Sequence, residues 1–170
     1  MKAIKLLLTL VMISLTSSVL AQSKGEMPFS SSSANANNLI RNAWAALSDA
    51  KREEANNYLR QVLSEDANCG IAYASLTGEN PEERTANLRK AAELKLSADE
   101  KMLVDGVLAG RDKKPNAEFF EPLIKKYPRD YYLHLWVMFT HTDKDRAIAI
   151  GENIAKRNPK FSPVYNFLGY

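Results

Sequence analysis

The feature that most constrains the fold is a series of apolar stripes at helical spacing, which come in pairs joined by short polar turns. The first stripe is Leu39, Ile40, Ala43, Ala46 and Leu47, and the second is Ala55, Tyr58, Leu59, Val62 and Leu63. Residues 48–50 join them, a turn short enough to lay two helices side by side. No stretch alternates apolar and polar residues as a half-buried strand would. The sequence therefore predicts an all-α fold.

Capping residues and prolines set the expected helix boundaries. Asn80 precedes Pro81, and a proline at the first helical position loses no hydrogen bond. Ser97 and Glu100 have the spacing of a capping box, and Pro122 predicts a kink or a late start in the helix that contains it. The expected helices are 35–47, 51–64, 70–77, 82–95, 98–110, 116–126, 130–140, 144–157 and 162 to the end.

The first 21 residues have the composition of a secretory signal peptide. Lysines precede an apolar run over 6–15, and small residues lead up to Ala21. The alternative is an uncleaved membrane anchor, but the run is shorter than the ~20 residues that a membrane span needs. We therefore expect that the signal peptide is cleaved before Gln22 and that the protein is exported by a bacterium, to the periplasm or out of the cell. After cleavage we expect no stable membrane span.

The next stretch, 22–35, contains a run of four serines and shows no helical periodicity. This composition is typical of a flexible polar tether. We expect the tether to end where Ser32 or Ser33 caps the first helix.

The chain also repeats itself. Tyr165 is followed three residues later by Leu168 and then by Gly169, a few residues beyond Pro159. This pattern resembles the tetratricopeptide repeat (TPR), in which small residues let two helices approach closely and a proline ends the second helix. The residues at the position that opens each first helix are Leu39, Tyr73, Met102, His134 and Tyr165, spaced 29 to 34 residues apart, against a family period of 34.

The resemblance implies a right-handed α-solenoid over 36–170, with about four helical hairpins and a fifth that is truncated. It places Ala43, Gly106 and Gly169 at the positions of close approach. It also implies a concave groove lined by the first helix of each hairpin. Carrying the family's groove positions over gives Ile40, Trp44, Leu103, Val107, Tyr132, Leu135 and Phe139.

A groove with these residues is mostly apolar, which suits an amphipathic helix or an extended apolar peptide better than an acidic tail. Trp44 is expected to face the groove, so Trp44→Ala is expected to weaken binding of a partner with little effect on stability. Trp136 lies in 131–139, which is apolar almost all round, and is expected in the core.

Composition argues against several other roles. The formal net charge of +3 includes the two lysines of the leader, and such a balance does not favour nucleic-acid binding. The chain has no Gly-rich phosphate loop, nucleophile elbow or Cys–His set, so no catalytic residue and no cofactor is predicted. The basic runs at 111–114 and 125–126 are interpreted as solvated helix ends.

The two histidines leave one alternative open. His134 and His141 lie seven residues apart, and Asp143 or Asp145 could complete a metal site. The competing interpretation is that His134 is partly buried and His141 lies in a turn. Cys69 begins a helix and is interpreted as a small buried residue.

Three functions follow from these patterns. The first is a non-catalytic exported interaction module that binds a protein or peptide in its groove. The second is a helper domain of a longer chain whose function lies beyond Tyr170. The third is a metal-assisted enzyme that uses His134, His141 and Asp143.

Overall fold

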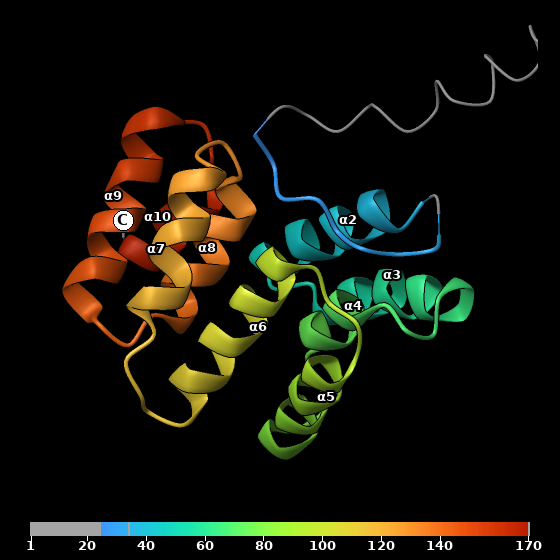
Figure 1. Ribbon diagram of the computed structural model, residues 1–170. Coiled ribbons are helices and arrows are strands. Elements are labelled where there is room, and N and C mark those ends of the chain that lie inside the picture. The colour runs from blue at the N-terminus through green and yellow to red at the C-terminus, as the bar shows by residue number, and fades with distance from the viewer. Residues whose placement is uncertain (1–24, 34, 170) are drawn as a thin grey trace, which may run out of the picture.

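The computed structural model describes residues 25–33 and 35–169, and every regular element in this part of the chain is a helix (Figure 1). The helices are α2 Ala36–Ser48, α3 Arg52–Glu65, α4 Gly70–Ser75, α5 Pro81–Glu93, α6 Ala98–Arg111, α7 Ala117–Lys126, α8 Tyr131–Thr140, α9 Lys144–Arg157 and α10 Pro163–Leu168. The predicted all-α fold is confirmed. The predicted signal peptide, 1–21, lies outside the described residues.

Side-chain caps begin several helices where the sequence predicts them. The Asn80 side chain accepts a hydrogen bond from the Glu83 N–H at 2.8 Å, one residue before Pro81 opens α5. At α6, Ser97 and Glu100 form the complete capping box. α7 begins at Ala117 and continues through Pro122, so the alternative of a late start is wrong.

Neighbouring helices pack in pairs. α2 packs on α3, α4 on α5, α6 on α7, and α8 on α9, while α10 packs on α9. Gly106 permits one of these contacts, because a Cβ atom there would lie 2.5 Å from Cε1 of Phe120 in α7. Gly169 does not have this role. Its φ is +78°, no atom of another described residue that is not its chain neighbour lies within 4 Å of its would-be Cβ, and it ends α10 as a left-handed cap.

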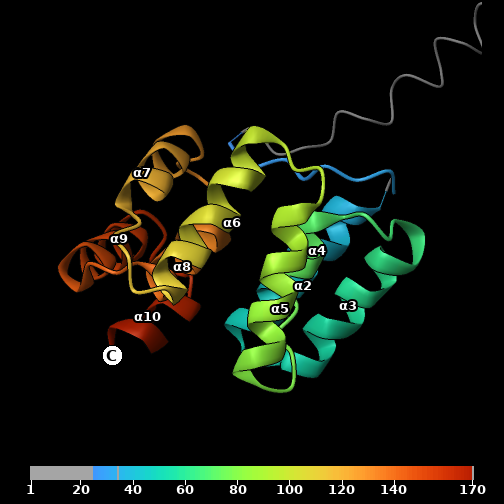
Figure 2. The same cartoon turned by 60° about the horizontal axis from the view of Figure 1, so that its bottom comes forward.

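The first helices of the four hairpins form a row that curves until its two ends meet. α4 contacts α2 and α6, α6 contacts α8, and α8 in turn contacts α2. Figures 1 and 2 show α6 between the α2–α5 hairpins and the α8–α10 part of the chain. The ring centroids of Trp44 in α2 and Trp136 in α8 lie 4.8 Å apart at this closure.

The segment 25–33 is packed into the body, which differs from the flexible tether that its composition predicts. Met27 and Phe29 are 1% and 5% exposed. The Met27 N–H donates to Asp130 at 2.9 Å, and the Ser30 N–H donates to Glu100 at 2.6 Å. Two apolar side chains and the buried carboxylates therefore hold a segment that looks polar overall.

The serines of this segment bond to the end of α3 rather than capping α2. Ser31 and Ser32 both donate to Asp66, at 2.8 Å each, and the Ser33 hydroxyl donates to Glu65. Asn35 occupies the N-cap position of α2 without a side-chain cap bond. The predicted cap by Ser32 or Ser33 is therefore wrong, because their polar groups are engaged elsewhere.

Asp130 connects the packed segment to both ends of the helix row. It is 1% exposed, and its Oδ1 accepts from the Leu133 N–H at 3.0 Å and from Arg41 Nη1 at 2.6 Å. Its Oδ2 accepts from Met27, and Arg41 Nη2 donates to the Met27 carbonyl at 2.6 Å. One buried carboxylate thus caps α8 and ties it to α2 and to the N-terminal segment.

We predict that Asp130→Ala lowers the free energy of unfolding by about 3–5 kcal/mol, because it leaves the Arg41 guanidinium and two N–H groups without their acceptor. Asp143→Ala is the matched control. Asp143 is exposed and only caps α9, through the Arg146 N–H, so its loss costs about 1 kcal/mol. Urea denaturation of both variants measures the difference. Equal losses would contradict the tertiary role of Asp130.

Candidate functional site

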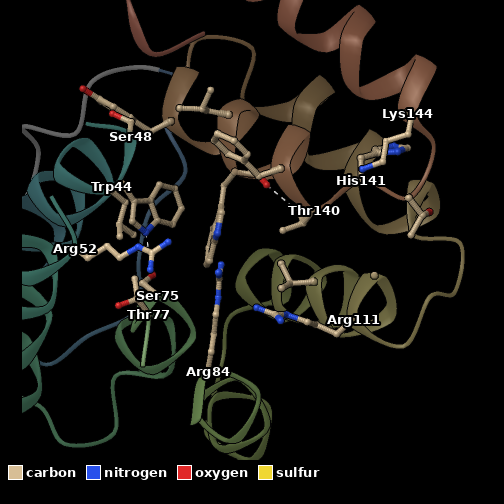
Figure 3. Close-up of a pocket in the computed structure, with 18 of the residues that line it drawn as sticks. Trp44, Ser48, Arg52, Ser75, Thr77, Arg84, Arg111, Thr140, His141 and Lys144 are labelled. Carbon is tan, nitrogen blue, oxygen red and sulfur yellow. Dashed lines mark hydrogen bonds between the residues drawn. The ribbon is translucent and has the colours of Figure 1, made fainter. Parts of the chain in front are cut away.

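A pocket of about 710 Å³ lies inside the curve of the helix row (Figure 3). Its walls come from α2, α4, α6 and α8, together with the first turns of α3, α5 and α9. The connections after α4, α6 and α8 also contribute. The lining residues are Trp44, Leu47, Ser48, Arg52, Ser75, Thr77, Arg84, Val107, Gly110, Arg111, Lys113, Tyr132, Leu135, Trp136, Phe139, Thr140, His141, Thr142 and Lys144. Such a volume is typical of small-molecule sites.

Most of the groove residues predicted from the sequence line this pocket. They are Trp44, Val107, Tyr132, Leu135 and Phe139. Ile40 and Leu103 do not line it, and each is 0% exposed. Both lie on first helices that pack against several neighbours at once, α2 on α3, α4 and α8, and α6 on α4, α5, α7 and α8. The curvature of the row thus moves these two positions into the core.

One side of the pocket is aromatic, and we call Trp44, Tyr132, Trp136 and Phe139 the aromatic wall. Trp44 is fixed in place, since its Nε1–H donates to the Ser75 hydroxyl at 2.9 Å and the Phe29 ring lies edge-on at 5.0 Å. Phe139 is 58% exposed. The wall therefore has an ordered inner end and an open outer end.

The two tryptophans have the opposite burial from that expected. Trp44 is 5% exposed and belongs to the core, whereas Trp136 is only partly buried. The expectation that Trp44→Ala would leave stability unchanged does not fit this burial, because the closure of α8 and the packing of Phe29 cover the indole.

The other side of the pocket is basic. Arg52, Arg84 and Arg111, which we call the arginine cluster, come from α3, α5 and α6, and Figure 3 shows their side chains pointing toward the same space. Lys113 and Lys144 also line the pocket, and no described Asp or Glu does. The expected mostly apolar groove is thus only half of the site.

The arginine cluster is electrostatically unfavourable by itself. The pKa of Arg84 is lowered, first by burial and then by the positive charges of Arg111 and Arg52. Elsewhere the half-buried arginines have carboxylate partners, such as Arg41 with Asp130 and Arg146 with Glu121. Among the described residues, no carboxylate forms an ion pair with any member of the cluster.

The basic side was missed by sequence reasoning. The sequence pattern of residues 111–114 indicates a solvated helix end, and no motif assigns a binding role to Arg52 or Arg84. A signal was present, because these two lie 32 residues apart, close to one repeat, each near the start of a second helix. Their convergence with Arg111 depends on the curvature of the row, which no local pattern encodes.

The residues of the possible metal site form separate structural contacts. His134 is 3% exposed and its Nε2–H donates to the Tyr127 carbonyl at 2.9 Å. His141 Nδ1 accepts from the Asp143 N–H at 3.1 Å, while the Asp143 carboxylate caps α9. Within residues 25–33 and 35–169, no three His, Cys, Asp or Glu side chains come close enough to hold a metal ion.

Cys69 is 1% exposed, in agreement with the interpretation as a small buried residue. Burial raises the pKa of its thiol, and its Sγ–H faces the Ser30 carbonyl at 3.8 Å. A buried thiol with a raised pKa is a poor nucleophile.

Comparison with known proteins gives no relative for this chain: no family model, no curated protein and no solved structure matches it. No helix in the described part of the chain is both long enough and apolar enough to cross a bilayer.

Burial lowers the pKa of His134 below its usual 6.5, so the unfolded chain takes up this proton first as the pH falls. We therefore predict that stability declines as the pH falls through about 6.5. His134→Gln keeps a donor for Tyr127 and removes the titration, so it loses less stability between about pH 7.5 and about pH 5.5. Urea denaturation at both values checks this, and equal losses in the two proteins would contradict it.

Proposed function

We propose that this protein is a non-catalytic, exported interaction module that binds a segment of a partner protein in the pocket inside its helix row. In this proposal the hairpins are TPR-like and form a short right-handed α-solenoid, and the protein acts in the bacterial periplasm or outside the cell. The observation that carries the proposal is the pocket itself, which lies where first-helix residues of all four helix pairs meet.

The pairing of the helices supports the solenoid. Each of four helix pairs contributes a first helix to one curved row, and Gly106 is small where α6 packs against Phe120 of α7. Such arrays bind extended segments or helices on their concave side. The leader over 1–21 supports export.

The chemistry of the pocket narrows the partner. An exposed aromatic side chain, Phe139, lies at its outer end, and five cations line it without a lining carboxylate in the described chain. A segment that presents an apolar side chain next to an acidic group complements both sides. An extended apolar peptide, one of the two partners that the sequence favoured beside an amphipathic helix, would leave the basic side unmatched.

We predict that Phe139→Ala weakens binding of segments selected from a random peptide library by at least about tenfold, since the exposed ring is a contact that a partner can bury. Ile148→Ala is the matched control, because Ile148 is 45% exposed but does not line the pocket. Fluorescence titration with the selected peptides measures both. Failure to select any peptide, or equal affinity of the two variants, would contradict the proposal.

A further inference from the structure

We propose that the basic half of the pocket binds an organic oxyanion: a carboxylate, phosphate or sulfate group that lies among Arg52, Arg84 and Arg111 and is carried on a flat apolar body against the aromatic wall. This inference rests on the pocket and deepens the proposed function by naming the chemical group that the occupant presents. It does not require the occupant to be a peptide.

The first reason is the missing counter-charge. Three guanidiniums from three helices line one pocket, where Arg84 is partly buried and Arg52 and Arg111 are exposed. In the described chain none of the three has an ion-pair partner. For the half-buried Arg84 this is unusual, because the half-buried Arg41 and Arg146 pair with carboxylates at 2.6 and 2.5 Å. A fold that gathers like charges without a counter-ion has an unfavourable local energy that an anionic ligand relieves.

The second reason is that the serine and threonine hydroxyls of the pocket have already used their protons. The hydroxyls of Ser48, Ser75 and Thr140 donate to backbone carbonyls at 2.7, 2.8 and 2.9 Å. The Thr142 hydroxyl donates to Asn116 at 3.1 Å. The donors that remain include the guanidinium N–H groups, the two lysines and His141 Nε2, which is buried without a hydrogen-bond partner in the described part of the chain. Among these donors the planar fork of a guanidinium matches the paired oxygens of a carboxylate or phosphate.

The third reason is the shape and composition of the opposite side. The aromatic wall and Leu135 face the same cavity, so a charged head among the arginines leaves its body in an apolar environment. The row of first helices closes where α2 meets α8, which limits the length of the site. A volume of about 710 Å³ accommodates a ring-sized body and its charged group.

The arrangement does not suit a nucleic acid strand. A phosphate backbone needs a basic stripe along a surface, whereas these cations gather around one pocket of a nearly neutral chain. The ligand therefore carries its charge at one end rather than along its length.

The test uses the tryptophans as built-in probes. The chain has two, and both line the pocket, so intrinsic tryptophan fluorescence reports on this site alone. The mature chain is titrated with 1-naphthyl phosphate, with 1-naphthol as the uncharged analogue and with inorganic phosphate as the bare anion. Two-dimensional NMR of the indole N–H signals provides a second readout.

We expect 1-naphthyl phosphate to bind at least about tenfold more tightly than either 1-naphthol or inorganic phosphate, because it alone satisfies both sides of the pocket. Arg84→Met keeps the aliphatic stem of the side chain and removes its charge. We therefore expect it to weaken the binding of 1-naphthyl phosphate about tenfold. Arg89→Met is the control, because Arg89 is exposed on the same helix and does not line the pocket.

Folding is checked in the same variants without ligand. Arg84→Met is expected to unfold at the same or a higher temperature than the wild type, because it removes repulsion by Arg52 and Arg111. If it unfolds earlier, Arg111→Met replaces it in the titration with the same expected loss.

The source of the oxyanion is distinguished by N-acetylphenylalanine and its amide, which model the end of a peptide. Tighter binding of the acid than of the amide, with the same loss in Arg84→Met, assigns the site to a peptide terminus. Binding of 1-naphthyl phosphate without binding of the acid assigns it to a free small molecule.

Equal affinity for 1-naphthyl phosphate and 1-naphthol, or equal affinity of Arg84→Met and Arg89→Met, would overturn the inference. Selected peptides that depend on Phe139 but not on Arg84 would leave the proposed function standing and refute the oxyanion site. Oxyanion binding without any selected peptide would support the oxyanion site and refute the proposed function.

Discussion

The fold depends on the contact that closes the helix row, where α2 meets α8. Asp130 accepts hydrogen bonds from Arg41, Leu133 and Met27 while almost fully buried, and beside it the two indoles pack at 4.8 Å. A buried carboxylate is tolerated only when its acceptors are satisfied, so the geometry of α2, α8 and the N-terminal segment is fixed together. Without this closure the concave side would be an open groove instead of a bounded pocket.

The closure also explains the composition of the pocket. The first helices α2 and α8 supply the aromatic wall, because their inner faces line the concave side of the row. The second helices α3 and α5 contribute only the arginines of their first turns, which reach the rim of the same space. Apolar and basic side chains therefore line the same space, and this combination favours a ligand with one flat and one negatively charged part.

The helices were predictable because their information is local. Apolar spacing, the capping box at Ser97 and the proline at 81 each specify a boundary within a few residues. The packed segment 25–33 was not predictable in this way, because Met27 bonds to a residue 103 positions away and its neighbours are serines. The arginine cluster could not be predicted for the same reason, and the prediction that Ile40 and Leu103 line the groove was wrong for that reason too. The curvature of the row, which local sequence does not encode, decides which residues face the pocket.

The closure is tested most directly by nuclear Overhauser contacts between the two indole rings. Trp44 and Trp136 are the only tryptophans in the sequence, so their side-chain signals can be assigned without ambiguity. With ring centroids 4.8 Å apart, the account predicts strong cross-peaks between protons of the two indoles. Fully assigned indoles that show cross-peaks only to their own helices would contradict the closed row and the pocket that depends on it.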